Sequence, residues 1–297
     1  MAGLRTALCT AVYPGVEPWL PELCRSIMEQ SDHDFELLVV LDGVSETTWL
    51  ESGGRDLRAR LIPAPPGATP AEVRNVLLYA ACAHDLLVLV DSDDVLLPER
   101  TAAARRTLQS ADVAGCAMEL VDVAGRPLGH TFGSQYDVVD DALILETNLF
   151  GMGNSAWHSR AMLPCLPIPP ACKAADWFLA TRARLQGRTF RFDPVPRMRY
   201  RQHPNNLAGV VPPFSPERLL RGADLAREHF DLVLGLREAE PGTRYRDRLL
   251  AASRGAARFC QRARTDSEWL AGVASDRNRR GPLEAWWAFL SAQEEDE

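Results

Sequence analysis

The sequence predicts an α/β protein in which helices flank a mostly parallel sheet and a helical region follows. Three observations lead to this prediction. Short apolar runs recur in the first part of the chain, segments with helical spacing separate them, and strand patterns end near residue 202. Strands that alternate with helices of this length are typical of βαβ units, in which neighbouring strands run parallel.

The first four predicted strands are apolar and are followed by turn-forming or polar residues. They cover residues 6–13, 35–41, 61–62 and 86–90. The fourth reads Leu-Leu-Val-Leu-Val, and such an unbroken run is typical of a strand buried on both faces. Because the carboxyl ends of parallel strands meet at one edge of a sheet, we expect Tyr13, Asp42 and residues 91–94 to lie together there.

Helices are predicted between these strands, where apolar residues recur at helical spacing. The first covers about 18–30, with Leu20 and Leu23 on one face. A second runs from residue 69 or 70 to about 83. A third begins near Pro98, since proline is favoured in the first helical turn.

The remainder of the chain contains an irregular stretch, a short α/β segment and a helical region. A strand is expected over 112–120, a weak pattern over 121–170 with a loop at 147–155, a helix over 174–186, and short strands at 189–192 and 198–202. Helical patterns then cover 216–237, 243–263 and the residues from 267 onward. We therefore predict a main domain over residues 1–212 and a helical region over 213–297. Trp286 and Trp287 are expected to pack this region onto the main domain or onto a second subunit of a homo-oligomer.

The composition excludes several classes of protein. Hydrophobic residues make up 46% of the chain and charged residues 25%, as expected for a soluble packed core. A net charge of -7 argues against nucleic-acid binding, which requires a basic surface. No apolar run approaches the ~20 residues of a transmembrane helix. Seven cysteines without a C-x-x-C pair indicate buried thiols in a reducing compartment, so we expect a cytoplasmic protein.

The segment Asp91-Ser92-Asp93-Asp94 directly follows the fourth predicted strand. Three carboxylates in four residues repel one another unless a cation or strong hydrogen-bond donors lie among them. Oxygen ligands suit Mg²⁺ or Mn²⁺, which bind through one or two carboxylates together with phosphate oxygens. The alternative is an acidic turn that caps the next helix.

Several short motifs follow one another in a specific order along the chain. They are Val12-Tyr13-Pro14, Asp42-Gly43, Arg74-Asn75, the acidic segment at 91–94, Asp176-Trp177-Phe178-Leu179 with Arg182 and Gly187, and Tyr200-Arg201-Gln202-His203. Over about residues 4–210 this series resembles the family-2 glycosyltransferases of the GT-A fold. The resemblance implies a metal-dependent enzyme that moves a sugar, with inversion, from a nucleotide-diphosphate sugar to a hydroxyl group of an acceptor.

The resemblance also implies a role for individual residues. Those expected to bind the nucleotide-sugar are Ala11, Tyr13, Asp42, Arg74, Asp93 and Arg201. Asp94 and His203 are expected to bind Mn²⁺ or Mg²⁺. Each role has a structural alternative: a strand-end packing residue for Tyr13, a turn residue for Asp42 or His203, and an ion pair with the acidic segment for Arg74.

Asp176 is the candidate general base of the implied reaction. It lies near the start of the predicted helix over 174–186, on the same helical stripe as Leu179, Ala180 and Ala183. The helix dipole favours an ionised carboxylate there, and this same property would explain a helix-terminal aspartate without catalytic function.

The sequence departs from the family pattern at four positions, which leaves other functions open. These are Ala11, Pro14, Leu41 and Ala175, where proline, asparagine, aspartate and glutamate are usual. A non-catalytic nucleotide-sugar-binding module would tolerate such losses. A nucleotidyltransferase of related fold is the other alternative, although no early Gly-rich loop with basic residues is present. The donor sugar, its nucleotide and the acceptor are not specified by the sequence.

Overall fold

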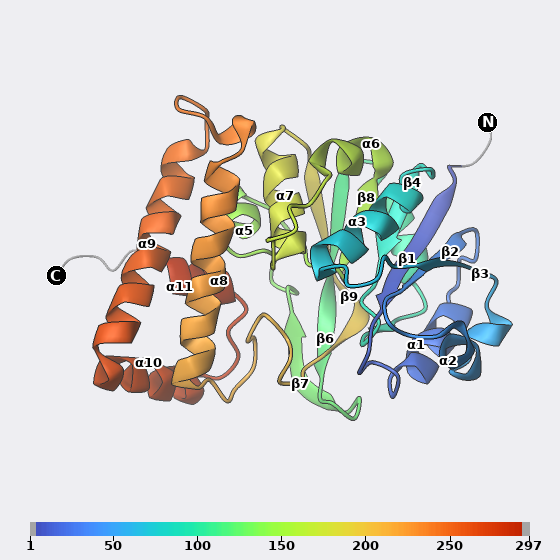
Figure 1. Cartoon of the computed structure of the whole chain (residues 1–297), viewed down its shortest axis with the longest axis horizontal. Coiled ribbons are helices and arrows are strands. Elements are labelled where there is room, and N and C mark those ends of the chain that lie inside the picture. The colour runs from blue at the N-terminus through green and yellow to red at the C-terminus, as the bar shows by residue number, and fades with distance from the viewer. Residues whose placement is uncertain (1–3, 293–297) are drawn as a thin grey trace. The chain divides into compact units, whose positions relative to one another are not determined.

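The computed structural model describes residues 4–292, which form two compact units (Figure 1). The first unit contains the residues up to Val139 together with Phe150–Ala171 and Gly187–Arg201. The second unit contains Asp140–Leu149, Cys172–Gln186 and the residues from Gln202 onward. The division of the chain after residue 212 stays a prediction. In the structure, the unit that holds the C-terminal helices also takes in two segments from the middle of the chain.

The first unit is built on a nine-stranded sheet, counted over residues 4–292, with the order β3-β2-β1-β4-β8-β6-β9-β5 and with β7 paired to β6. The strands are β1 Thr6–Val12, β2 Glu36–Leu41, β3 Ala59–Pro63, β4 Leu86–Leu89, β5 Val95–Leu96, β6 Val113–Val121, β7 Pro127–Phe132, β8 Ser155–His158 and β9 Phe190–Arg201. Strands β3, β2, β1 and β4 are parallel, as predicted. The other half is mixed, because β8 runs antiparallel between β4 and β6 while β6 and β9 are parallel.

The irregular stretch expected over 121–170 contains two strands, β7 and β8, that the sequence pattern does not reveal. Strand β8 has only four residues, which is too short for an alternating pattern to be distinctive. The two strands expected at 189–192 and 198–202 form the single long strand β9. Its pairing with β6 shifts register on both sides of Ala117, close to Pro194 and Pro196 of β9, which interrupt the apolar pattern.

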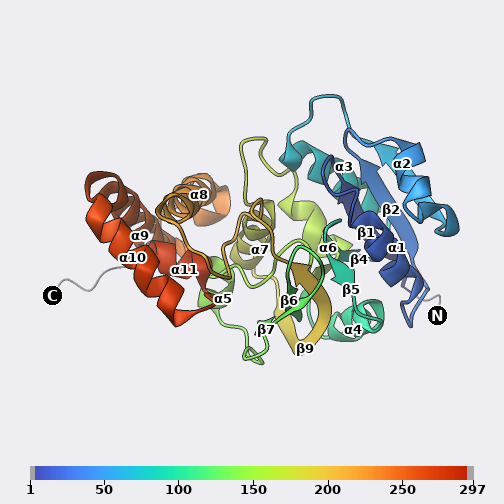
Figure 2. The same ribbon diagram turned by 90° about the horizontal axis from the view of Figure 1, so that it is seen from below.

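Helices cover both faces of the parallel strands. In the first unit they are α1 Leu20–Met28, α2 Glu46–Glu51, α3 Pro70–Ala81, α4 Arg100–Thr107 and α6 Ser159–Met162. Helices α1 and α3 lie on opposite sides of β1 and β2 (Figure 2). Leu8 and Leu23 belong to the core on the α1 side, where both side chains are fully buried. Helix α3 begins in a capping box formed by Thr69 and Glu72, which fixes the start of the helix.

The second unit is helical. Its helices are α5 Asp141–Leu145, α7 Ala175–Leu185, α8 Pro216–Leu234, α9 Arg246–Thr265, α10 Ser267–Arg280 and α11 Trp286–Ser291. Trp286 and Trp287 are buried inside this unit, where the Trp287 ring stacks against Trp177 at a centroid distance of 5.2 Å. Across residues 4–292, none of the helices is both long enough and apolar enough to cross a membrane.

Candidate active site

The loop formed by residues 91–94, called here the acidic loop, connects β4 to β5 at the carboxyl end of the parallel strands. Asp93 is 7% exposed and Asp94 only 2% exposed, so these carboxyl groups are removed from bulk water. The Asp94 N–H donates a hydrogen bond to the Asp91 carbonyl at 3.2 Å, which closes the loop into a turn. This geometry places three carboxyl groups within one turn at the sheet edge.

The carboxyl group of Asp94 is bonded by one backbone N–H and lies close to a glycine. Its Oδ1 accepts a hydrogen bond from the Arg201 N–H at 2.8 Å. A Cβ atom added to Gly153 would lie 3.0 Å from Asp94 Oδ2 and 3.2 Å from Asp91 Oδ2. Gly153 therefore borders both carboxylates, and a side chain there would fill the space that they face.

Like charges and burial make the acidic loop electrostatically unfavourable by itself. Burial, followed by the carboxylates of Asp93 and Asp91, raises the pKa of Asp94 well above its usual range, while Arg201 opposes this shift. A divalent cation would offset the same repulsion, and carboxylate oxygens are the ligands that Mg²⁺ and Mn²⁺ prefer. The donor set therefore fits such an ion. Over the described part of the chain, no group of three or more His, Cys, Asp or Glu side chains is arranged to hold a metal alone. This is compatible with a site that needs phosphate oxygens of a ligand to complete it.

Arg201 is buried and forms hydrogen bonds with the acidic loop. Its side chain is 1% exposed, and its Nε donates to the Asp93 carbonyl at 2.7 Å. Its Nη2 contacts Glu22 Oε2 at 2.5 Å, and Nη1 donates to the Val123 carbonyl at 3.1 Å. Because these contacts engage all sides of the guanidinium group, we interpret Arg201 as a residue that positions the loop. Its predicted contact with a diphosphate would require these bonds to open.

Tyr13 and Arg74 lie within electrostatic range of the acidic loop. Burial and the negative charges of Asp93 and Asp91 raise the pKa of Tyr13, and the Arg74 guanidinium acts in the opposite direction. Tyr13 nevertheless remains 40% exposed, so part of its ring faces solvent. The structure thus brings an accessible aromatic ring, a cation and the carboxylates to one place.

The ends of β1 and β2 bring Ala11 and Asp42 to the same edge. The Asp42 N–H donates to the Val12 carbonyl at 2.8 Å, and Ala11 pairs with Val40 in the sheet register. Gly43 has a φ of +67°, and a Cβ at this position would lie 3.2 Å from Pro14. The turn after β2 is therefore packed against the turn after β1, next to Tyr13.

The second unit contains Asp176 in the first turn of α7. Its carboxylate is half-buried, and Oδ2 accepts a hydrogen bond from Asn148 Nδ2 at 3.1 Å. The neighbouring Trp177 is fully buried and donates from Nε1 to the Leu145 carbonyl at 3.1 Å. These contacts tie the start of α7 to the end of α5 and to the loop that follows it, so Asp176 lies on a well-anchored helix terminus.

His203 also belongs to the second unit, in the turn that follows β9. Its N–H donates to Asn206 Oδ1 at 2.5 Å, and its Nδ1 accepts from the Asn205 N–H at 3.3 Å. These bonds orient the imidazole ring. Metal binding by His203 stays a prediction.

Comparison with solved structures relates this arrangement to known proteins. TarS of S. aureus in complex with UDP-GlcNAc matches with a TM-score of 0.62 at 19% identity, over 86% of this chain and 72% of TarS residues 1–349. A mannosyltransferase from Pyrobaculum calidifontis in complex with GDP-Man and Mn²⁺ matches with a TM-score of 0.61 at 17% identity, over 95% of this chain and 76% of that one. The chain has the GT-A fold. By sequence, no model of a protein family and no curated protein matches it.

The site residues expected from the sequence are divided between the two units of this GT-A protein. Those in the first unit are Ala11, Tyr13, Asp42, Arg74, Asp93, Asp94 and Arg201, whereas Asp176 and His203 belong to the second. Gly153 and Asn148 are not among the predicted site residues, because both fall in the stretch 147–155, whose pattern predicts only a loop. Asn and Gly tolerate a positive φ, and Gly also allows the backbone to approach other groups closely. These properties are the signal in the sequence that could have indicated the two residues.

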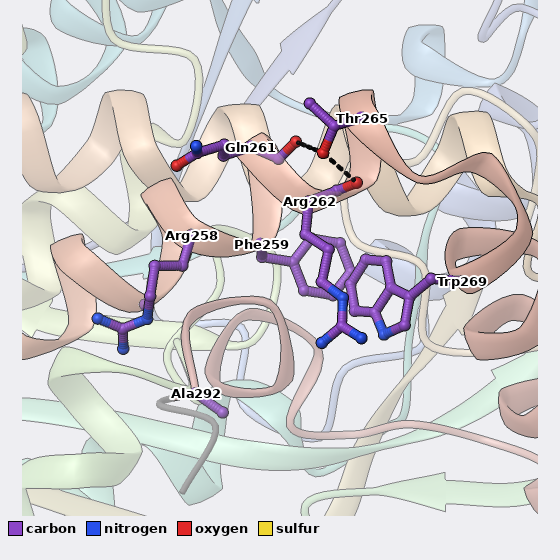
Figure 3. Close-up of a pocket in the computed structure, with 8 residues that line it drawn as sticks. Arg258, Phe259, Gln261, Arg262, Thr265, Trp269 and Ala292 are labelled. Atoms are coloured by element: carbon purple, nitrogen blue, oxygen red, sulfur yellow. Dashed lines mark hydrogen bonds between the residues drawn. The ribbon is translucent and has the colours of Figure 1, made fainter. Parts of the chain in front are cut away.

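A separate cavity of about 300 Å³ lies among α9, α10 and Ala292 in the second unit (Figure 3). Its aromatic walls are Phe259 and Trp269, and the Arg262 guanidinium lies 4.6 Å from the Trp269 ring centroid. None of the predicted site residues lines this cavity.

Proposed function

We propose that the chain is a family-2 glycosyltransferase that transfers a sugar from a nucleotide-diphosphate sugar to an acceptor hydroxyl with inversion. The observation that carries this proposal is the convergence of Tyr13, Arg74 and the acidic loop at the carboxyl edge of a GT-A sheet. A ligand crevice is expected at this edge in open α/β sheets. The aromatic ring suits a nucleobase, the cation suits phosphates, and the carboxylates suit a divalent ion.

In this proposal Mn²⁺ or Mg²⁺ is held by Asp94, with Asp93 at a metal-bound water or the ribose and His203 as a further ligand. When bound, the ion supplies positive charge that stabilises the departing diphosphate. Asp91 shares the same space at Gly153, so we add it to the residues that face the ion. Arg201 keeps the loop in shape through its contacts to Asp93, Asp94 and Glu22.

The donor is proposed to bind with its base between the turns after β1 and β2. Asp42 would accept a hydrogen bond from the base, Tyr13 would border the ring, and Ala11 would allow close approach of the nucleotide. Arg74 would pair with the base or a phosphate, for which its position beside the acidic loop is suitable.

Asp176 is proposed to take the proton of the acceptor hydroxyl. As the proton leaves, the acceptor oxygen forms a bond to the anomeric carbon, and the bond from that carbon to the diphosphate oxygen breaks with its electron pair. One displacement of this kind inverts the anomeric centre and needs no covalent sugar–enzyme intermediate. The N-terminal turn of α7 favours the ionised carboxylate that a base requires.

The ligands of the two similar structures guide the choice of donor. One protein is described with UDP-GlcNAc and the other with GDP-Man and Mn²⁺. Both nucleotides are therefore included in the tests, together with dTDP. The seven cysteines are all free thiols, which fits the cytoplasm that we propose as the location.

A thermal-shift experiment with UDP, GDP and dTDP, each with and without Mn²⁺ or Mg²⁺, tests the proposal. Stabilisation by a nucleoside diphosphate that depends on the metal is the expected result. A preference for nucleoside triphosphates would instead support a nucleotidyltransferase. Stabilisation without release of nucleotide from any sugar donor would support a non-catalytic binding module, to which Leu41 and Ala175 point. No response to any nucleotide would contradict a nucleotide-sugar site.

A further inference from the structure

Asn148 has an unfavourable backbone conformation beside Asp176. Among residues 4–292 it is the single non-glycine residue with a positive φ, at +56°. This left-handed region is disfavoured for residues with a Cβ atom, although asparagine tolerates it better than most. Asn148 lies in the loop after α5, where the next residue along, Leu149, donates from its N–H to the Leu143 carbonyl at 3.0 Å.

The side chain of Asn148 has a second unfavourable feature. Its Nδ2 donates to Asp176 Oδ2 at 3.1 Å, but its own Oδ1 is buried without a hydrogen-bond partner. An unpaired buried carbonyl lowers stability, because the group has lost its hydrogen bonds to water. Asn148 therefore combines a positive φ with an unpaired side-chain oxygen, and in this arrangement its amide bonds Asp176. Such strain at one residue indicates that the bond to Asp176 is retained for function.

The surroundings keep this pair in place. Trp177 Nε1 donates to the Leu145 carbonyl, and Arg184 forms a 2.6 Å ion pair with Asp141, so two further bonds join α5 to α7. The Asn148 amide therefore approaches Asp176 from a fixed direction. Its Nδ2 hydrogen bond occupies Oδ2 of the carboxylate, which leaves Oδ1 for a second partner.

We propose that Asn148 is the positioning residue of the general base, a conclusion that rests on the proposed role of Asp176. Its amide fixes the plane of the carboxylate by donating to Oδ2. Oδ1 is then the oxygen that takes the proton of the acceptor hydroxyl. Asn148 itself does not touch the reacting atoms.

The substitution Asn148→Gly separates this role from a structural one. Glycine adopts a positive φ without strain and has no side-chain amide oxygen to be buried without a partner. The melting temperature should therefore stay the same or rise. The rate of transfer should nevertheless fall about tenfold, the effect of one lost hydrogen bond, with the KM for the donor unchanged. The control is Gly255→Ala, which crowds the packing of α9 against α11 in the same unit. It should lower the melting temperature and leave kcat unchanged.

The measurement is release of UDP from UDP-GlcNAc, or of GDP from GDP-Man, with Mn²⁺ and with water as the acceptor, for the donor that the wild-type protein cleaves.

The outcomes separate this inference from the proposed function. If Asp176→Asn releases nucleotide as fast as the wild type, Asp176 is not the base and the proposed mechanism fails. If Asp176→Asn is impaired while Asn148→Gly keeps the rate of the wild type, only the positioning role of Asn148 is overturned. The positioning role is equally overturned if Asn148→Gly loses melting temperature and rate together, as a structural residue would. In an Asp176→Asn background, Asn148→Gly should have no further effect on the rate.

Discussion

The backbone N–H of Arg201 donates a 2.8 Å hydrogen bond to Oδ1 of Asp94, although the two residues are 107 positions apart in the chain. The guanidinium group of Arg201 also donates a hydrogen bond, from Nε, to the carbonyl oxygen of Asp93. The end of β9 thus shapes the loop after β4 from both backbone and side chain. Because the loop carries the proposed metal ligands, the packing of β9 and the binding of a ligand should be coupled.

We expect Asp94→Asn to abolish the metal-dependent part of the stabilisation by a nucleoside diphosphate. The substitution keeps the shape of the side chain and removes the negative charge that a divalent ion requires. The ligand-free protein should be as stable as the wild type or more so, because a buried carboxyl group with two acidic neighbours has been removed. Thermal-shift assays with UDP or GDP, with and without Mn²⁺, measure both effects. An unchanged response to Mn²⁺ would remove Asp94 from the metal site, and Glu99→Gln on the surface is the control.

Arg201→Lys should destabilise the first unit by about 2 kcal/mol, because lysine cannot reproduce the several hydrogen bonds of the buried guanidinium group. It should also weaken metal-dependent nucleotide binding, since the acidic loop loses its support. The control is Arg126→Lys, whose ion pair with Asp122 is exposed on the arginine side, so its stability should stay close to that of the wild type. Urea unfolding measures both variants. Equal stabilities for the two variants would show that the Arg201 contacts contribute little.

His229 should make the protein less stable as the pH falls below about 6.5, the pKa of an exposed histidine. It is 2% exposed, is stacked on Trp177 at 3.7 Å, and has no hydrogen-bond partner on either ring nitrogen. Burial lowers its pKa from 6.5 to about 3. The unfolded chain therefore binds a proton that the folded protein does not, between pH 6.5 and about 3. The contribution of His229 to the free energy of unfolding is complete above pH 6.5. It decreases by about 1.4 kcal/mol per pH unit as the pH falls through this window.

The measurement is urea unfolding at several pH values for the wild type and for His229→Phe, which keeps an aromatic ring on Trp177. The stability of the variant should depend less steeply on pH between 4 and about 6.5. His130→Gln, on the exposed strand β7, should have the slope of the wild type. If the wild type and His229→Phe lose stability in parallel, then His229 is protonated in the folded protein and our interpretation of its burial fails.

The parallel half of the fold could be predicted from the sequence, because unbroken apolar runs and helical spacing are local signals. Strand β8 could not, since its four residues are recognisable only through their pairing with β4 and β6. The motif residues indicated a site, but not the orientation of each side chain. Arg201 illustrates the limit: a sequence names an arginine, whereas only packing decides whether it faces a ligand or the acidic loop. The contacts of Gly153 and Asn148 depend likewise on segments distant in the chain.

Two glycines of the helical unit allow a test of its packing by the same substitution. A Cβ atom at Gly255 of α9 would lie 2.1 Å from the Ser291 carbonyl oxygen in α11, so the helices could not keep their present contact. Gly255→Ala should therefore destabilise this unit by about 1–3 kcal/mol, as is usual when extra atoms are forced into a packed interior. At Gly272 of α10 nothing lies within 4 Å of the added atom. There, Gly272→Ala should stabilise the protein by about 0.5–1 kcal/mol, because alanine is the better helix former. Urea unfolding of both variants gives the two values, and effects of the same sign would show that α11 does not pack on α9 through Gly255.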